Sequence, residues 1–142
     1  MNDSVSSTKP TLLNPPGLYD PAPNGYSHIA MVPAGTRLAF IAGQGGETAD
    51  GRLSSDFREQ VRQAMANLLI AIEAAGGQTS QVAKLTVLIV DHSEQRLGIL
   101  GEELARAFGA QMKPVCTLIP VPRLALDGML FEIDAVLVLP DR

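Results

Sequence analysis

A chain of 142 residues has the usual length of a single domain and can bury about 70% of the surface that its unfolded form exposes. The composition, 46% hydrophobic and 18% charged, excludes extensive disorder, and the apolar stretches are shorter than the roughly 20 residues of a transmembrane helix. Lys and Arg number 11 against 15 Asp and Glu, a net charge of −4 without a basic run, which argues against a nucleic-acid or anionic membrane partner.

Residue types that hold metals and disulfides are scarce. The single cysteine, Cys116, excludes an internal disulfide and a cysteine-based metal cluster, and only His28 and His92 are available as imidazole ligands. The chain has no phosphate-binding loop, dinucleotide-binding glycine motif or HExxH motif, so we expect neither a metal nor another cofactor. The first residues lack the basic and apolar regions of a signal peptide, and a cytoplasmic location is the default expectation.

The first third of the chain predicts a tail, loops and two strands. Residues 1–10 are small and polar, which predicts a disordered tail, and four prolines within residues 11–23 predict an extended segment or loops. Short strands are predicted at residues 27–32 and 37–43. The intervening Pro33-Ala34-Gly35-Thr36 predicts that these two strands form a hairpin.

Two helices are expected in the remainder. The first begins after Ser55 or Asp56 and ends before Gly76-Gly77, with apolar residues spaced by three and four: Phe57, Val61, Ala64, Met65, Leu68, Leu69 and Ile72. The second spans residues 93–108, with an apolar stripe of Leu97, Leu100, Leu104 and Phe108. Gly98 and Gly101 each weaken this helix by roughly 1 kcal/mol relative to alanine.

Strands are predicted at residues 82–90, 115–121 and 130–139, which completes the order β-β-α-β-α-β-β of one α+β domain over residues 11–142. In the last strand Phe131, Ile133, Ala135 and Leu137 share one face, whereas Val136 and Val138 lie on the other. Two helices can cover only one face of such a sheet. We therefore expect a second copy of the chain to cover the opposite face in a closed homo-oligomer.

Five sequence segments, in this order, resemble the RidA-like (reactive-intermediate deaminase) family over about residues 20–139. They are Gly25-Tyr26-Ser27-His28 with Phe40-Ile41-Ala42-Gly43-Gln44; the helix with Phe57, Gln60, Gln63 and Asn67-Leu68 before Ala75-Gly76-Gly77; Val82-Ala83-Lys84-Leu85-Thr86-Val87 with Asp91; Pro114-Val115-Cys116-Thr117-Leu118; and Phe131-Glu132-Ile133-Asp134-Ala135.

The resemblance implies a chorismate-mutase-like fold, assembled as a homotrimer around a central barrel, with ligand clefts between subunits. It implies hydrolysis of enamines or imines, such as 2-aminoacrylate, to a keto acid and ammonia. Glu132 matches the family glutamate that positions or activates water. The substrate-binding positions implied by the match are Tyr26, Ala42, Gly43, Cys116, Thr117 and Leu118, with His28 as a further candidate.

One position departs from the family pattern. The arginine that grips the substrate carboxylate in active members is replaced by Cys116. A bidentate arginine–carboxylate contact contributes on the order of 1.5–3 kcal/mol. Its absence should weaken binding of a 2-imino acid roughly 10- to 100-fold unless another cation replaces it. The fold therefore follows from the resemblance more directly than the activity does.

Each candidate also has a structural interpretation. Cys116 is either a small buried hydrophobe or a thiol activated by His28, and Glu132 either faces the cleft or is a solvent or interface carboxylate. Tyr26 is a cleft wall or an anchor of the N-terminal segment. His92 and the helix face with Arg58, Glu59 and Arg62 are interpreted as solvated.

Three functions remain open at the sequence level. The first is an enamine or imine deaminase, and the second is a non-catalytic small-molecule binder or regulator that uses the same cleft. The third, a ribonuclease, is disfavoured by the acidic charge balance.

Overall fold

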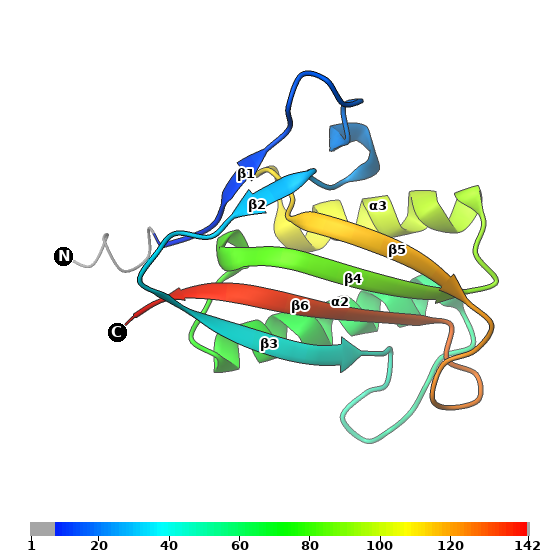
Figure 1. Cartoon of the computed structure of the whole chain (residues 1–142). Helices are drawn as coiled ribbons and strands as arrows, with labels where there is room; N and C mark the ends of the chain where they lie inside the picture. The colour runs from blue at the N-terminus through cyan, green and yellow to red at the C-terminus, as the bar shows by residue number, and fades with distance from the viewer. Residues whose placement is uncertain (1–7, 142) are drawn as a thin grey trace.

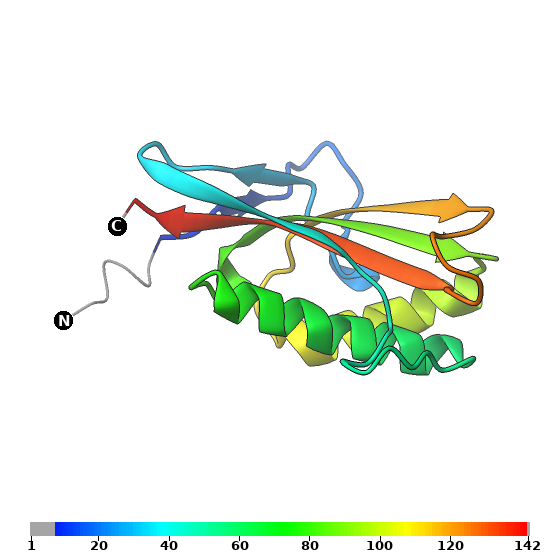
Figure 2. The same ribbon diagram turned by 90° about the horizontal axis from the view of Figure 1, so that it is seen from below.

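Two helices lie against one face of a four-stranded sheet in the computed structural model, which describes residues 8–141 (Figures 1 and 2). The helices are α2 (Phe57–Ala74) and α3 (Glu94–Phe108), and across the sheet the strands are β3 (Thr36–Gln44), β6 (Phe131–Pro140), β4 (Val82–Val90) and β5 (Val115–Val121). Strands β4 and β5 are parallel, and the other neighbouring pairs are antiparallel. A second sheet joins β1 (Thr11–Leu13) and β2 (Ile29–Met31), and single 3-10 turns span Ala22–Asn24 and Thr79–Gln81.

Capping side chains explain where the helices begin. The Asp56 carboxylate accepts a hydrogen bond of 3.0 Å from the backbone N–H of Glu59, and the Ser93 hydroxyl accepts one of 3.2 Å from that of Arg96. Both residues therefore satisfy a backbone donor that has no partner within its helix. The predicted α+β class, both helices, and the strands Val82–Val90 and Val115–Val121 are confirmed.

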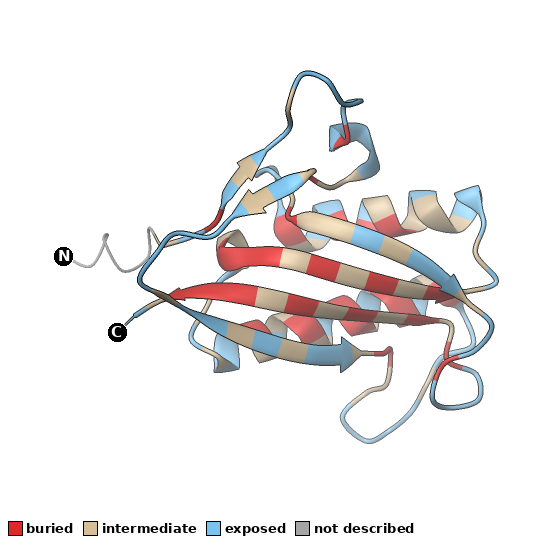
Figure 3. Cartoon of the chain, viewed as in Figure 1, coloured by how far each residue is buried: buried red, intermediate tan, exposed pale blue. Residues whose placement is uncertain are grey.

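The core lies between the helices and the sheet, where buried side chains alternate along the central strands (Figure 3). The predicted inward residues of β6, Phe131, Ile133, Ala135 and Leu137, are at most 2% exposed. They pack against the apolar stripes of α2 and α3 together with Val82, Leu85, Val87 and Ile89 of β4. The alternation predicted from the sequence is thus confirmed on the covered face.

The predicted hairpin between residues 27–32 and 37–43 is wrong. Strand β2 pairs with β1, a segment expected to be extended or looped, whereas β3 pairs with β6. The physical reason is the number of backbone hydrogen bonds that each pairing can form. Strand β6 is long enough to pair with β3 along most of its length, whereas β2 is only three residues long. Partner choice between strands distant in sequence leaves no local signal.

A buried carboxylate ties the two helices together. Glu103 of α3 is 1% exposed, and its oxygens accept hydrogen bonds from Arg58 (2.9 Å) and Arg62 (3.0 and 3.3 Å) of α2. Arg106 forms a further ion pair at 3.3 Å. These arginines lower the pKa of Glu103, Arg62 most strongly, against the opposing effect of burial. The interpretation of this helix face as solvated is therefore incomplete: Glu59 is exposed, and Arg58 and Arg62 are partly exposed but also form ion pairs with Glu103.

The two helices leave the opposite face of the sheet uncovered (Figure 2), and that face carries exposed apolar side chains. Phe40 is 75% exposed, Leu38 50% and Ile119 43%, and Leu88, Val90 and Val136 are half-buried on the same face. Neither helix of the described residues is long and apolar enough to cross a membrane. Residues 1–7 of the predicted tail lie outside the described residues, while the Thr8 carbonyl accepts a hydrogen bond from Gln81 and Pro10 is buried.

Candidate functional site

A pocket of about 380 Å³ brings together four of the predicted site residues at the outer edge of the sheet. It lies between β5, α3 and the segment before β2. Tyr26, Cys116, Thr117 and Leu118 line it, together with Asn24, Gly25, Leu97, Leu100 and Leu104. From the sequence, these three leucines are expected only in the apolar core-facing stripe of α3. In the structure they also line the pocket, where α3 faces the edge of β5.

Ser27 attaches the segment with Tyr26 to the beginning of β5. Its backbone N–H donates to the Pro114 carbonyl at 3.1 Å, and its hydroxyl donates to the Lys113 carbonyl at 2.5 Å. The hydroxyl groups of Tyr26 and Tyr19 are hydrogen-bonded to each other. Tyr26 is therefore both an anchor of the N-terminal segment and a wall of the pocket, so the two interpretations do not exclude each other.

His28 belongs to a different environment. Its Nε2 lies 2.8 Å from the Tyr19 carbonyl, and its ring packs edge-on against the rings of Tyr19 and Tyr26. It lines a hollow with residues of the uncovered sheet face, including Val136. No hydrogen bond joins His28 to Cys116 within residues 8–141.

Burial keeps the Cys116 thiol protonated. Cys116 is half-buried against the core, and desolvation raises its pKa to about 11, with a small opposing effect of Lys84. A thiol with this pKa is almost entirely neutral at pH 7, so it is a poor nucleophile. The structure therefore favours the interpretation of Cys116 as a small neutral side chain.

Glu132 lies on the opposite face of the sheet, beside Gly43. A β-bulge interrupts the pairing of β3 with β6 between Ile41 and Gln44, so β3 continues through Gly43 rather than ending there. An ideal Cβ on Gly43 would lie 2.6 Å from Cδ and 2.8 Å from Cγ of Glu132. Because glycine has no Cβ, the Glu132 carboxylate can occupy the space above residue 43. Ala42 is exposed next to it and lines neither pocket.

The Glu132 carboxylate is available for water or a ligand. It lines a small hollow of about 80 Å³ with Gly43, Thr86, Leu88 and Asp134. The Asp134 carboxylate accepts a hydrogen bond of 3.1 Å from the Thr86 backbone, whereas no hydrogen bond or ion pair engages the Glu132 carboxylate within residues 8–141.

The sheet separates these two groups of candidate residues. Cys116 is paired with buried Leu85 and faces the helices, while Glu132 is paired with Leu88 and faces away from them. Strand β4 lies between β5 and β6, which places their backbones about 10 Å apart. Within one chain, the predicted catalytic residue and the pocket therefore do not form one site.

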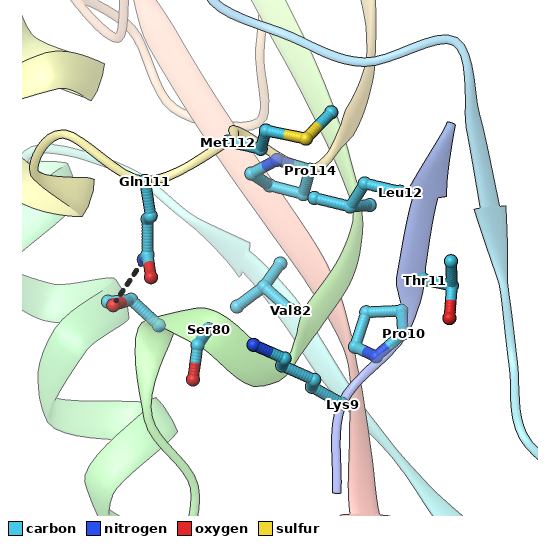
Figure 4. A pocket seen from close by; sticks show the side chains of 10 residues that line it. Lys9, Pro10, Thr11, Leu12, Ser80, Val82, Gln111, Met112 and Pro114 are labelled. Carbon is cyan, nitrogen blue, oxygen red and sulfur yellow. Dashed lines mark hydrogen bonds between the residues drawn. The ribbon is translucent and has the colours of Figure 1, made fainter. Parts of the chain in front are cut away.

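A larger pocket, of about 500 Å³, lies between the N-terminal segment and the turn before β4 (Figure 4). Its walls include Lys9, Ser80, Val82 and Gln111, and the Gln111 amide donates to Thr79. It contains none of the predicted site residues. Among residues 8–141, no group of three or more His, Cys, Asp and Glu side chains is placed to hold a metal ion.

Comparison with known proteins is consistent with this architecture. The family model described as endoribonuclease L-PSP matches residues 19–139. The chain is 36% identical over 122 residues to the RutC family protein PH0854 of Pyrococcus horikoshii, covering 82% of this chain and 89% of that protein. It is 32% identical to the RutC family protein YjgH of Escherichia coli, over 74% of this chain and 78% of that one.

A solved structure has the same fold. The Rid family protein YyfB of Yersinia pestis, whose structure is described as that of a protein of unknown function, superimposes with a TM-score of 0.88 at 29% identity. The superposition covers 92% of this chain and 99% of the other. Since the family model spans most of the domain and two curated relatives exceed 30% identity, the chain belongs to the RidA-like family.

Proposed function

We propose that this chain is a hydrolase that converts a small enamine or imine into the corresponding carbonyl compound and ammonia. Glu132 directs the attacking water, and a neighbouring copy in a homotrimer completes the cleft. The observation that carries the proposal is the free carboxylate of Glu132 in the space left by Gly43. Membership of the RidA-like family supports the reaction class.

The chemistry requires one base and one water molecule. The Glu132 carboxylate accepts a proton from water while the water oxygen bonds to the carbon of the C=N group. The nitrogen takes up the protons, the C–N bond of the resulting carbinolamine breaks, and ammonia leaves as the C=O group forms. An enamine enters the same sequence after its β-carbon is protonated. Water is the only co-reactant.

A second copy of the chain supplies what one chain lacks. A ligand in the pocket beside Cys116 is on the wrong face of the sheet to reach Glu132 of the same chain. The exposed Phe40 and Leu38 favour coverage of the other face by another copy, because large exposed apolar patches typically mark interfaces. In the homotrimer, the pocket of one subunit then lies against Glu132 of the next.

A non-catalytic binding or regulatory role is the second candidate. It is favoured by Cys116, since a neutral thiol occupies the position where active members carry the carboxylate-binding arginine. This role predicts thermal stabilisation by a ligand without turnover. A ligand at 100 times its dissociation constant adds about 2.7 kcal/mol to the free energy of unfolding.

The first test measures imine hydrolysis. Imines generated by an amino-acid oxidase or an amine oxidase supply substrates with and without a carboxylate, and ammonia release is followed with wild type, Glu132→Gln and the exposed control Glu73→Gln. Acceleration of either class by wild type and Glu73→Gln, lost in Glu132→Gln, is expected. Rates equal to the spontaneous rate for both classes at ample enzyme would refute the deaminase and favour the binder.

A complementation experiment tests the shared cleft. Leu97→Trp fills the pocket, Glu132→Gln removes the base, and each variant alone should be inactive. Mixing the two variants by unfolding and refolding together should restore activity, because some clefts combine an intact pocket with an intact Glu132. The exposed Leu126→Trp serves as the control for Leu97→Trp. Failure of the mixture to recover activity, when wild type refolded in the same way is active, would refute the shared cleft.

A further inference from the structure

We propose that the pocket beside Cys116 selects an uncharged, apolar ligand group and discriminates against carboxylates. This inference rests on the proposed function in taking that pocket as the ligand site, and it names the substrate class: alkyl- or aryl-substituted imines or enamines without a carboxylate next to the C=N carbon. The pocket wall carries the inference, because none of its nine residues is charged.

The wall is apolar on one side and neutral on the other. Leu97, Leu100 and Leu104 of α3 form the apolar side, and their surface favours alkyl or aromatic carbon. Cys116 contributes a thiol that is a weak hydrogen-bond donor and has no charge at neutral pH. A carboxylate placed there would lose its hydration without gaining an ion pair.

Neutral hydrogen-bonding partners are available for an imine or amide nitrogen. Strand β5 forms the edge of the sheet, and the Pro114 carbonyl at its start is directed away from β4 toward Ser27. Because the direction of backbone groups alternates along a strand, Leu118 presents its N–H and C=O toward the same open edge. The Asn24 amide and the Tyr26 hydroxyl complete a set of polar groups without charge.

Three cations near the pocket in sequence or in the fold already have hydrogen-bond partners. The Lys113 ammonium donates to the Gln111 carbonyl at 2.8 Å, and the Arg123 guanidinium binds the Leu124 carbonyl and Asp127. The Lys84 ammonium donates to the Thr117 hydroxyl at 3.2 Å, on the face of the sheet turned away from the helices. Of these three cations, Lys84 is the one bonded to a residue of the pocket wall, and the test therefore includes it.

The experiment compares two probes of similar shape, benzamide and benzoate. Dissociation constants are taken from NMR shifts of the backbone amides of Cys116, Thr117 and Leu118 in the full-length protein. We expect wild type and Cys116→Ser to bind benzamide at least 10-fold more tightly than benzoate. Cys116→Arg should reverse the preference, since a charge-assisted arginine contact changes affinity roughly 10- to 100-fold. Where Cys116→Arg does not fold, wild type and Cys116→Ser carry the test.

Three results would overturn the inference. They are benzoate binding as tight as benzamide in wild type, no shift of these amides with either probe, and a benzamide preference unchanged in Cys116→Arg. In the first case, loss of benzoate binding in Lys84→Met would identify the cation responsible. This binding experiment does not depend on turnover. A protein that prefers benzamide here but releases no ammonia in the imine hydrolysis test would therefore refute only the proposed reaction. An active enzyme that prefers benzoate refutes only the selectivity.

Discussion

Gly43→Ala tests whether residue 43 positions the Glu132 carboxylate. An alanine Cβ would collide with Oε2 of Glu132 and lie 2.6 Å from its Cδ, so the carboxyl group has to move by at least about 1 Å to restore an ordinary contact of about 3.5 Å. The backbone of Gly43 is not in the left-handed region, and alanine adopts its conformation without strain. The collision with Glu132 is therefore the specific consequence of the substitution.

Two opposing terms set the expected change in stability. Alanine in place of a glycine within a strand raises the free energy of unfolding by about 0.5–1 kcal/mol. Forcing the Glu132 side chain away from its rotamer costs about 0.5–1.5 kcal/mol. When Gly43→Ala is made in the wild-type protein, these two changes in the free energy of unfolding nearly cancel. When it is made in Glu132→Ala, only the stabilisation by alanine remains, so the free energies of the two substitutions should be coupled by about 1 kcal/mol.

Urea denaturation of the two single variants, the double variant and wild type measures this coupling. Gly98→Ala is the matched control: nothing lies within 4 Å of its new Cβ, and it should add about 1 kcal/mol in both backgrounds. Equal effects of Gly43→Ala with and without Glu132 would refute the placement of the carboxylate over residue 43. If the proposed reaction is correct, Gly43→Ala also lowers kcat up to about 100-fold, since a 1 Å misplacement has effects of that order.

Three further substitutions probe the fold and the assembly. Gln60→Leu removes three hydrogen bonds of a fully buried amide and should lower the free energy of unfolding by about 3 kcal/mol in urea denaturation. Glu103→Gln should cost about 1–2 kcal/mol at pH 7, because the arginine partners are partly exposed. The pKa of Glu103 is lowered in the folded state, chiefly by Arg62, so this contribution is present above the unfolded carboxyl pKa of about 4.3 and is lost as the pH falls below it. Urea midpoints of wild type and variant should therefore approach each other as the pH falls below about 4.3 and through the lowered pKa of folded Glu103. Phe40→Glu should dissociate the proposed trimer in sedimentation velocity, while Ile70→Glu on α2, at a residue of similar exposure, should not.

The parts of the fold with strong periodicity were predictable to within a residue or two. The helix-face repeat of Phe57 to Ile72 and the caps Asp56 and Ser93 locate α2 and α3, because these signals are local. The strand pairing was not predictable in the same way. The partner of β3 lies about a hundred residues further along the chain in β6, and nothing in either segment specifies that pairing.

The candidate site also has features that were predictable from local sequence and features that were not. Side-chain alternation within β6 indicates that Glu132 lies opposite Phe131 and Ile133, on the uncovered face. The position of Cys116 relative to Glu132 requires the register of β5 on β4 and of β4 on β6, which is a tertiary property. The β-bulge at Ala42–Gly43 likewise could not be predicted, although the glycine at position 43 is compatible with it.

Glu103 shows a signal that was present and under-used. It follows Leu100 by three positions on α3, so the same helical periodicity that buries Leu100 and Leu104 also turns Glu103 toward α2. An acidic residue at the margin of an apolar stripe requires cations on the facing helix. Arg58 and Arg62, four residues apart on α2, provide them. Matching charges between predicted helix faces would have found this ion pair.

In the proposed trimer, the charged side chains of Lys84, Glu132 and Asp134 on the uncovered face have different roles. Burying a charge is costly unless it is paired, and Lys84 and Asp134 already have partners in Thr117 and the Thr86 backbone. The Glu132 carboxylate has none within residues 8–141, so a dry interface over it would be unstable. A subunit contact on this face therefore has to keep water or a polar ligand against Glu132. Burial of apolar surface is favourable around Phe40, whereas the cost of desolvating an unpaired charge favours a hydrated cleft at Glu132, which is where the proposed hydrolysis needs its water.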